Sequence, residues 1–463
     1  MTYLYLAVMA LLVLAGFYAG RTRSMAISSG RQSELHSLPI YHGGFVAIGV
    51  FVPMAAAYLV GVPLVNYLAE SRALSYYSSE TLSDALQRSV ILRDIARIAA
   101  GQAAGEIQAP LQDASAAYAR IRSFGFGAVL LAGIALGLAS LVASYWKISI
   151  PFRARHYVER FAKVVLVASA VVAILTTIGI VFSLVFETYR FFFDPALKGK
   201  PTIPGFLFGL DWNPQAAMRA DQGELSTAYG FVPLLLGSLL ITVIAICVAG
   251  PLGLFSAIYL AEYAGPRVRA YAKPVLEILA GIPTVVLGFF AALTVAPMIR
   301  EFGTHYGLDI ASESALAAGL VMGMMIIPFI SSLSDDVINA VPQSLRDGAY
   351  ALGATKSETI KQVILPAALP GIVSAFMLAI SRAIGETMIV VMAAGLAANL
   401  TFNPLDAVTT ITVQIKTILV GDQEFDSAKT LSAFALGFVL FFVTLSLNFI
   451  AIRIAQRYRE QYD

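Results

Sequence analysis

Two opposite charges, Arg382 and Glu386, lie in the middle of a long apolar stretch, and Thr387 follows them directly. They are the only charged residues between 369 and 398. A charge inside a membrane costs about 2.5–3.5 kcal/mol on insertion scales, so it usually faces a pathway or a partner. If the stretch is one helix, the i, i+4 spacing places both side chains on one face, within pairing distance.

The pair of Arg382 and Glu386 has two possible interpretations. The arginine can open toward an oxyanion with its fork of donors, while the glutamate neutralises it at rest. An ion pair that only locks two helices together explains the same residues equally well. The residues alone leave both readings open.

A second stretch, 346–366, carries a helix–glycine–helix pattern between two apolar blocks. The residues before Gly353 can form a helical turn, and Gly353 permits a sharp change of direction. Thr355 or Ser357 can then cap a second short helix that ends before Pro366. A stiff element of this kind can receive a push from a soluble partner and pass it to the spans that it joins.

The chain lacks the motifs of common catalytic and nucleotide sites. It contains no Gly-x-x-x-x-Gly-Lys-[Ser/Thr] and no Gly-x-Ser-x-Gly. Cys247 is the single cysteine, which excludes an internal disulfide and a thiolate metal cluster. His36 and His42 share a short loop, but ordinary polar loop residues explain them better than a zinc pair does. We therefore expect no catalytic and no metal-binding residue on this chain.

The composition is that of an integral membrane protein. Hydrophobic residues make up 58% of the 463 residues and charged residues only 13%, with a mean hydropathy of +0.77. The net charge of +2 gives no reason to expect a nucleic acid partner. Apolar blocks that cross lipid must be helical, because no backbone polar group can be left bare there. Nine blocks are long enough to span a hydrocarbon core of about 30 Å: 2–20, 43–67, 124–146, 164–186, 231–260, 272–298, 315–333, 369–398 and 431–452.

Basic residues set the orientation of these spans, since they favour cytoplasmic loops. The C-terminal tail carries Arg453, Arg457 and Arg459, so we expect it in the cytoplasm. The N-terminus is then expected outside. Counting back from the tail, alternation places every short basic loop on the cytoplasmic side: 334–368, 261–271, 147–163 and 21–42.

The chain divides near residue 155. The N-terminal region, 1–155, has three spans and an external segment, 68–123, in which we expect two helices, one beginning near Thr81 and one opened by Pro110. The C-terminal region, 156–463, has six spans with both ends inside. The predicted fold class is an all-α membrane protein, with a six-span core preceded by three additional spans. Glycines four apart, such as Gly16/Gly20 and Gly319/Gly323, are expected to mark close helix packing. Asp335 and Asp336 are expected to be solvated charges at the membrane interface.

The stretch 346–366 resembles the cytoplasmic docking loop of ABC-importer permeases. The family pattern is Glu-Ala-Ala, three residues, Gly, nine residues, Ile, one residue, Leu-Pro. Here nine residues also separate the glycine from the Val-Ile-Leu-Pro run, while the start reads Asp-Gly-Ala and so departs from the pattern. The resemblance implies that the following residues dock an ATPase subunit: Asp347, Ala349, Gly353, Leu365 and Pro366.

The membrane spans carry a narrower resemblance. Arg-Ala-Ile-Gly-Glu-Thr at 382–387 and Glu-Ile-Leu-Ala-Gly-Ile-Pro-Thr-Val-Val-Leu-Gly at 277–288 look like the permeases of the bacterial phosphate importer. The segment Trp-Asn-Pro at 212–214 and the run 388–395 favour the C-type subunit over its A-type partner. The resemblance covers 164–460 and leaves the N-terminal region uncovered.

This resemblance implies a permease subunit of an ATP-driven phosphate importer in the bacterial cytoplasmic (inner) membrane, working by alternating access. Arg382, Glu386 and Thr387 would line the substrate pathway. No cofactor is expected on this chain, because ATP and Mg²⁺ would bind to separate ATPase chains. The implied partners, besides membrane lipid, are a second permease of the A-type, two ATPase subunits and an external phosphate-binding protein.

Three alternatives differ in what they predict. An ABC permease for another oxyanion, such as sulfate, molybdate or phosphonate, would share all the features above. A non-ABC anion channel or secondary transporter would use Arg382 and Glu386 as an ion gate and would not purify with an ATPase. A structural membrane scaffold would show no substrate uptake.

Overall fold

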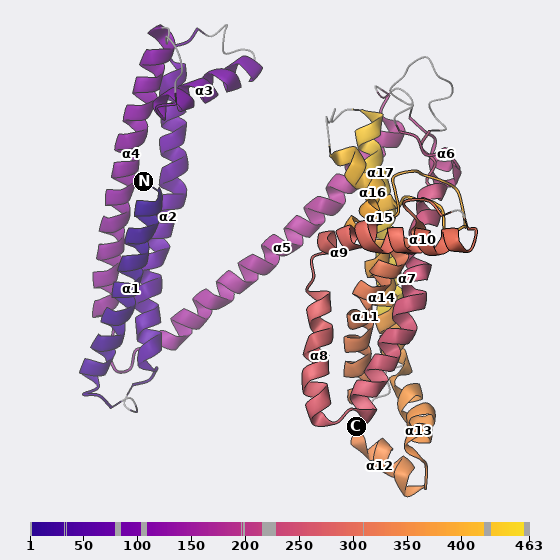
Figure 1. Cartoon of the computed structure of the whole chain (residues 1–463). Coiled ribbons are helices and arrows are strands. Elements are labelled where there is room, and N and C mark those ends of the chain that lie inside the picture. The colour runs from indigo at the N-terminus through magenta and orange to yellow at the C-terminus, as the bar shows by residue number, and fades with distance from the viewer. Residues whose placement is uncertain are drawn as a thin grey trace. The chain divides into compact units, whose positions relative to one another are not determined.

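The computed structural model folds this chain into helices, and no β-strand occurs among the residues that it describes. Nine helices in the described ranges are long and apolar enough to cross a membrane, which confirms the predicted all-α membrane class. Contacts divide the chain into two compact units, Met1–Thr176 and Thr177–Asp463 (Figure 1). The residues described are 2–31, 33, 35–78, 85–102, 109–195, 197, 200–214, 228–308, 310–420 and 427–457.

Three long helices form the body of the first unit: α1 (Thr2–Ile27), α2 (Pro39–Leu74) and α4 (Ala109–Trp146). They lie side by side, and each contacts the other two (Figure 1). Tyr5 and Met54 are buried at the centre of this bundle. The Tyr5 hydroxyl donates a 2.7 Å hydrogen bond to the Met54 carbonyl, so α1 and α2 are joined by a polar contact as well as by packing.

A proline within α2 shows how this bundle keeps its backbone paired. The nitrogen of Pro53 carries no hydrogen, so the carbonyl of Gly49, four residues earlier, loses its helical donor. The Ser140 hydroxyl of α4 donates to this carbonyl instead. A bare carbonyl in lipid is costly, so the serine allows a span to contain a proline.

The segment 68–123, predicted to hold two separate external helices, differs in some respects from this prediction. α3 (Ala85–Ala99) is a separate helix, but the helix opened by Pro110 continues into the third span as α4. The predicted helix start at Thr81 lies outside the described residues. α3 packs on the ends of α2 and α4 through a small buried cluster: Ala69, Ala73, Ile95, Ala114 and Tyr118.

One helix, α5 (Ala154–Phe193), begins at the predicted domain boundary. The division by contacts falls inside this helix, between Thr176 and Thr177. The basic residues from Arg155 to Lys163, predicted to lie in a loop, form the first turns of α5. The boundary at 155 stays a prediction.

The second unit is built around two long helices in close contact, α7 (Val232–Ile258) and α11 (Ala315–Asn339). Gly319 and Gly323 allow α11 to approach α7. A Cβ on Gly323 would lie 3.0 Å from the carbonyl oxygen of Ala245. This confirms the packing role that the glycine spacing predicted.

The predicted sixth span, 272–298, is not one straight helix. It breaks at Gly-Ile-Pro, 281–283, and the chain then runs across α7 instead of along it (Figure 1). A residue that precedes proline disfavours the helical conformation, which explains the position of the break. The elements on its two sides are α8 (Pro266–Ala280), α9 (Thr284–Phe290), the π-helical η5 (Ala291–Val295) and α10 (Ala296–His305).

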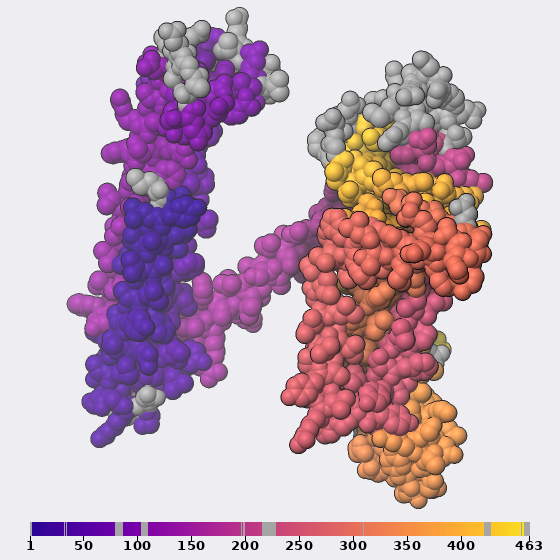
Figure 2. Space-filling view, viewed as in Figure 1, coloured from indigo at the N-terminus to yellow at the C-terminus, as the bar shows by residue number. Residues whose placement is uncertain are grey.

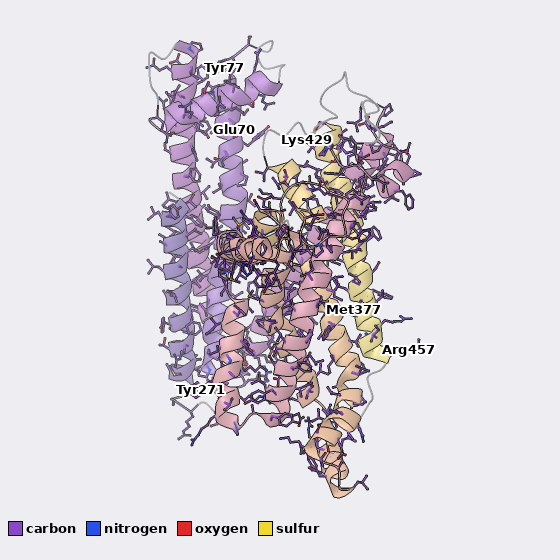
Figure 3. All side chains as sticks on the ribbon, turned by 45° about the vertical axis from the view of Figure 1, so that its right-hand side comes forward. Glu70, Tyr77, Tyr271, Met377, Lys429 and Arg457 are labelled. Atoms are coloured by element: carbon purple, nitrogen blue, oxygen red, sulfur yellow. The ribbon has the colours of Figure 1, made fainter. Side chains whose placement is uncertain are left out.

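One end of the second unit is covered by an aromatic cluster. It joins the end of α5 to α6 (Ile203–Phe208), α16 (Ile411–Leu419) and α17 (Ala428–Arg457). Lys429 marks the end of α17 at this cluster, and Arg457 lies toward the opposite end (Figure 3). The Trp212 indole donates a 2.9 Å hydrogen bond to the side chain of Gln414, which fixes the Trp-Asn-Pro segment to α16.

The contact between α1 and α2 depends on Gly43, because a Cβ there would lie 2.7 Å from the Phe17 carbonyl oxygen. Replacing Gly43 by valine should force the helices apart and lower the free energy of unfolding by about 1–3 kcal/mol. Valine at Gly127 of α4 is the matched control, since a Cβ there meets no atom within 4 Å. Thermal unfolding in detergent measures both variants. Equal losses would contradict this account of the helix contact.

Candidate functional site

The structure breaks the predicted eighth span, 369–398, at the motif that carries its two charges. α14 (Leu365–Ile384) ends there, and a short second helix, α15 (Met388–Ala393), follows. Arg382 lies in the last turn of α14, and Glu386 lies in the turn between the two helices. The expectation that the two side chains share one helix face is wrong, because i, i+4 neighbours face each other only within a continuous helix.

Glu386 caps the second helix. Its Oε1 atom accepts hydrogen bonds from the N–H groups of Met388, at 3.0 Å, and Ile389, at 3.4 Å. The first N–H groups of a helix have no acceptor within the helix, and a carboxylate there also favours the helix dipole. The Thr412 hydroxyl donates a 2.8 Å hydrogen bond to the Glu386 carbonyl. Both the side chain and the main chain of Glu386 are therefore fixed.

Arg382 is exposed on the surface of the second unit. Within the described residues of the chain, no ion pair joins it to Glu386 or to another carboxylate. A pair that locks two helices is thus not what these residues form.

The two family-like motifs, 277–288 and 382–387, meet where α9 packs on α15. A Cβ on Gly288 would lie 3.0 Å from the Met388 carbonyl oxygen and 2.8 Å from the Met392 sulfur, so a larger residue would push α9 away. Thr387 is half-buried at this junction, and its carbonyl accepts the Val391 N–H at 2.9 Å. The helices that follow the two breaks, α9 and α15, thus pack against each other although they are distant in sequence.

The stretch 346–366 has the helix–glycine–helix form that the sequence predicts. α12 (Gln343–Ala351) comes first, and α13 (Lys356–Thr359) follows the turn. Between them, Gly353 has a φ of +86°. That conformation is strained for any residue with a Cβ, so the sharp turn requires glycine.

A capping box begins the second helix of this loop. The Thr355 hydroxyl accepts a hydrogen bond from the Glu358 N–H, and the Glu358 carboxylate accepts the Thr355 N–H at 2.8 Å. Two donors without helical partners are satisfied at once. Of the two predicted caps, Thr355 is the one that the structure uses.

The loop stands out from the second unit at one end (α12 and α13, orange in Figure 2). Its tip is apolar: the side chain of Leu352 is 91% exposed, and Tyr350 is also exposed. The predicted docking residues are not equally accessible. Ala349 is buried, Leu365 is half-buried, and three are exposed: Asp347, Gly353 and Pro366.

The second helix of the loop does not end before Pro366, so this prediction is wrong. α13 continues through the π-helical η6 (Ile360–Ile364) directly into α14. Pro366 lies in the first turn of α14, where the hydrogen-bond register changes after the π-helical turn and the missing N–H costs least. The loop 346–366 therefore shares one helix with Arg382.

The ionic contact that holds α12 was not predicted from the sequence. Arg346 donates to Glu262 through two nitrogens, at 2.9 and 3.2 Å. It also donates to the backbone carbonyls of Ile338, at 2.9 Å, and Val341. Both charged side chains are nearly buried. The available signal was Glu262, the only acidic residue in the loop 261–271.

Asp335 was another misjudged charge. It was expected to be solvated, but only 1% of its side chain is exposed, and it accepts hydrogen bonds from Arg269 and Lys273, both at 2.9 Å. Spacing within α11 could not show that α8 brings two cations to it. Asp336 stays exposed, as expected. Nowhere in the described ranges do three or more His, Cys, Asp or Glu side chains form a group that could hold a metal ion.

Two family models match the chain. One, described as "Binding-protein-dependent transport system inner membrane component", matches residues 249–460, which include the loop 346–366 and Arg382. The other, described as "Phosphate ATP-binding cassette transporter", matches residues 6–176, the region that the motifs left uncovered.

Curated relatives decide the family. A probable ABC transporter permease protein of Bacillus subtilis, YqgH, is 35% identical over 247 residues, which are 53% of this chain and 75% of the relative. The phosphate transport system permease protein PstC 1 of Mycobacterium tuberculosis is 31% identical over 278 residues, 54% of this chain and 81% of the relative. This chain belongs to the PstC family of ABC-transporter permeases. A solved bacterial alginate ABC transporter chain is 14% identical, with a TM-score of 0.45, covering 67% of this chain and 99% of that chain.

Membership in this family makes the chain a multi-pass transport subunit of the inner membrane. The family that the motifs predicted and the predicted all-α membrane fold class are confirmed. The roles of Arg382, Glu386 and Thr387 and of the docking residues remain predictions.

Because Glu386 caps α15 and no ion pair to Arg382 is found among the described residues, the two side chains should stabilise the fold independently. Arg382→Met and Glu386→Gln, alone and combined, should change the free energy of unfolding additively to within about 0.5 kcal/mol. Glu386→Leu should cost about 0.5–2 kcal/mol more than Glu386→Gln, which keeps an acceptor oxygen for the Met388 N–H. Denaturant unfolding measures these values. Strong non-additivity would reveal a pair that the structure does not show.

Proposed function

We propose that this permease carries inorganic phosphate into the cytoplasm through an ATP-driven importer of the inner membrane. The observation that carries the proposal is the family match over 249–460, which includes both the docking loop and Arg382. The names of its PstC relatives support phosphate as the cargo. The exposed Arg382 fits this cargo, because a guanidinium can bind two phosphate oxygens at once.

The break between α14 and α15 supports alternating access. A polar turn next to an exposed arginine, between two helices of an otherwise apolar span, resembles the discontinuous helices at which many transporters bind their substrates. The helix that runs from α13 to Ile384 connects this break to the docking loop. A displacement of α13 would therefore move the α14 end of the substrate site. Thr387, half-buried beside Glu386, completes the proposed pathway lining.

The exposure of Arg382 supports a second permease subunit. A charge in a membrane span is costly when it faces lipid, so a neighbouring chain has to cover it or enclose a water-filled path beside it. An A-type permease would supply the other wall of this pathway. Phosphate selection would lie mainly with an external binding protein.

Two ATPase subunits would bind ATP and Mg²⁺ and drive the cycle, one of them at the docking loop of this chain. The exposed Leu352 and Tyr350 offer an apolar tip for that contact, and the exposed Asp347 offers a charge beside it. No nucleotide motif occurs in this chain, which supports ATP hydrolysis on a separate chain.

The docking role places the α12 and α13 end of the second unit in the cytoplasm. The Arg457 end of α17 lies toward this end, in agreement with a cytoplasmic C-terminus (Figure 3). Alternation then places the N-terminus outside. The N-terminal region, 1–155, would be an accessory domain outside the transport path, since it has spans of its own and a separate family match.

Uptake by vesicles that contain the reconstituted complex tests the function. Radiolabelled phosphate should enter only with ATP and the binding protein present, and excess sulfate, molybdate or phosphonate should not compete. Competition by one of these anions would assign the cargo to that oxyanion. Uptake without any ATPase subunit would instead indicate a channel or secondary transporter.

Replacing Gly353 by valine should detach the ATPase, because a β-branched residue strains at a φ of +86° and would misalign α12 and α13. Gly348→Val in α12 is the matched control, since neither site has an atom within 4 Å of a new Cβ and only Gly353 has a positive φ. ATPase recovered with the tagged permease measures docking. Equal recovery with both variants would remove the basis for the docking role.

Arg382→Gln should abolish phosphate uptake, and Arg382→Lys should keep only a fraction of it, because an ammonium cannot form the two-oxygen contact of a guanidinium. Arg300→Gln provides a control for loss of one arginine in the same unit. The initial rate of ATP-dependent uptake, measured at equal amounts of assembled complex, gives the effect. Normal uptake by Arg382→Gln would show that the arginine does not contact the anion.

A further inference from the structure

We propose that the ion pair between Arg346 and Glu262 transmits the movement of the docking loop to the end of α7. Both would be positioning residues for the transport step. The inference rests on the proposed function, because it requires an ATPase that moves the loop. It adds a second route for the movement, apart from the helix that joins α13 to α14.

The geometry makes Arg346 a junction of three elements. Its guanidinium, on α12, binds the Glu262 carboxylate in η4 (Tyr259–Tyr263), the π-helical end of α7. It also donates to the Ile338 and Val341 carbonyls at the end of α11. The side chains of Arg346 and Glu262 are only 10% and 7% exposed. Water therefore competes little for these bonds, and α12 cannot turn without moving them.

A second contact joins the other helix of the loop to the same segment. The Lys356 ammonium lies 4.9 Å from the centroid of the Tyr263 ring, within the range of a cation–π interaction. α12 and α13 thus hold neighbouring residues of η4 on the two sides of Gly353. A π-helical turn is a rare, locally widened form that is frequent at functional sites.

The helix that follows η4, α8, is held by few buried contacts. α8 has no buried residue, although it is 15 residues long. It contacts α11 through the ionic cluster around Asp335, among other residues, and ends at the 281–283 break. Few buried contacts mean a low cost of local movement. A pull on Glu262 would therefore displace α8 more readily than a helix packed in the core.

The packing of α7 and α11 against the helices next to the docking loop does not depend on the ion pair alone. A separate apolar cluster already packs α7, α11, η6 and α14 together, with Ala257, Ile338, Ile360 and Ile364 among its buried members. A buried ion pair often adds little net stability over apolar residues of similar size, but it favours one geometry. Its loss should therefore affect the transmission of movement more than folding.

The test uses the complete reconstituted complex and measures phosphate imported per ATP hydrolysed. The variants are Glu262→Gln and the double replacement Arg346→Met with Glu262→Met, which leaves no buried charge unpaired. The control replaces Arg190 and Glu187 by Met and Asp194 by Asn, which removes the ion pairs at the end of α5, an element apart from the docking loop (Figure 1). ATPase recovery with the permease is measured first for each.

The double variant should retain the ATPase and hydrolyse ATP, while its phosphate-to-ATP ratio falls about tenfold, within the usual range of coupling between sites. Glu262→Gln should lower the ratio less, because its amide oxygen still accepts from Arg346. The control should keep the wild-type ratio.

An unchanged ratio in the assembled double variant would overturn this role. If the double variant does not assemble, an unchanged ratio in Glu262→Gln overturns it equally. If Glu262→Gln lowers the phosphate-to-ATP ratio but the double Met variant keeps the wild-type ratio, the ion pair acts only as a packing contact and the proposed role is overturned. Absence of ATP-dependent uptake by the wild-type complex would instead overturn the proposed function itself.

Discussion

The structure depends on one constraint: inside a bilayer, each backbone polar group has to find a partner within the protein. Helices meet this constraint along their length, so the informative places are those where a helix is interrupted. At Pro53, the Ser140 hydroxyl replaces the missing donor of the Gly49 carbonyl. At the start of α15, the Glu386 carboxylate accepts the N–H groups of Met388 and Ile389. A hydroxyl or carboxylate in a span thus permits a break that lipid would otherwise forbid.

The two breaks of the second unit lead into short helices that pack against each other. The interruption at 281–283 leads into α9, and the one after Ile384 leads into α15, and these two short helices pack against each other at Gly288. The turns themselves lie at the surface of the unit, since Gly281, Pro283 and Gly385 are exposed. The contact between α9 and α15 is apolar, and Leu287, Ile389 and Val390 belong to its buried cluster. Under the proposed function, the path of the anion would pass Arg382 and the exposed turn after Ile384.

The sequence predicted the features that follow from local pattern. Nine apolar blocks, the turn at Gly353 and the cap at Thr355 are each specified by a few neighbouring residues. Features that depend on partners distant in sequence were misjudged: the single helix through Arg382 and Glu386, and the solvated Asp335. Hydropathy reports how apolar a segment is, but not which donors will replace a broken hydrogen bond or which cations another helix will bring. The helix that passes through Pro366 shows the same limit, because a π-helical turn has no sequence signature of its own.

α5 explains why the domain boundary has no single position. At 1.5 Å per residue its 40 residues extend for about 60 Å, roughly twice the thickness of a hydrocarbon core. Its first turns carry Arg155, Arg160 and Lys163, and its last turns carry the Arg190 ion pairs, so charge lies at both ends of the apolar stretch. Charge patterning therefore places a boundary before the span, where the basic residues are. Contacts and the family match 6–176 place it within the span. Because α5 is continuous with both units, only a functional test can assign it to one of them. Truncations that end before, within and after α5 would therefore show what the N-terminal unit contributes.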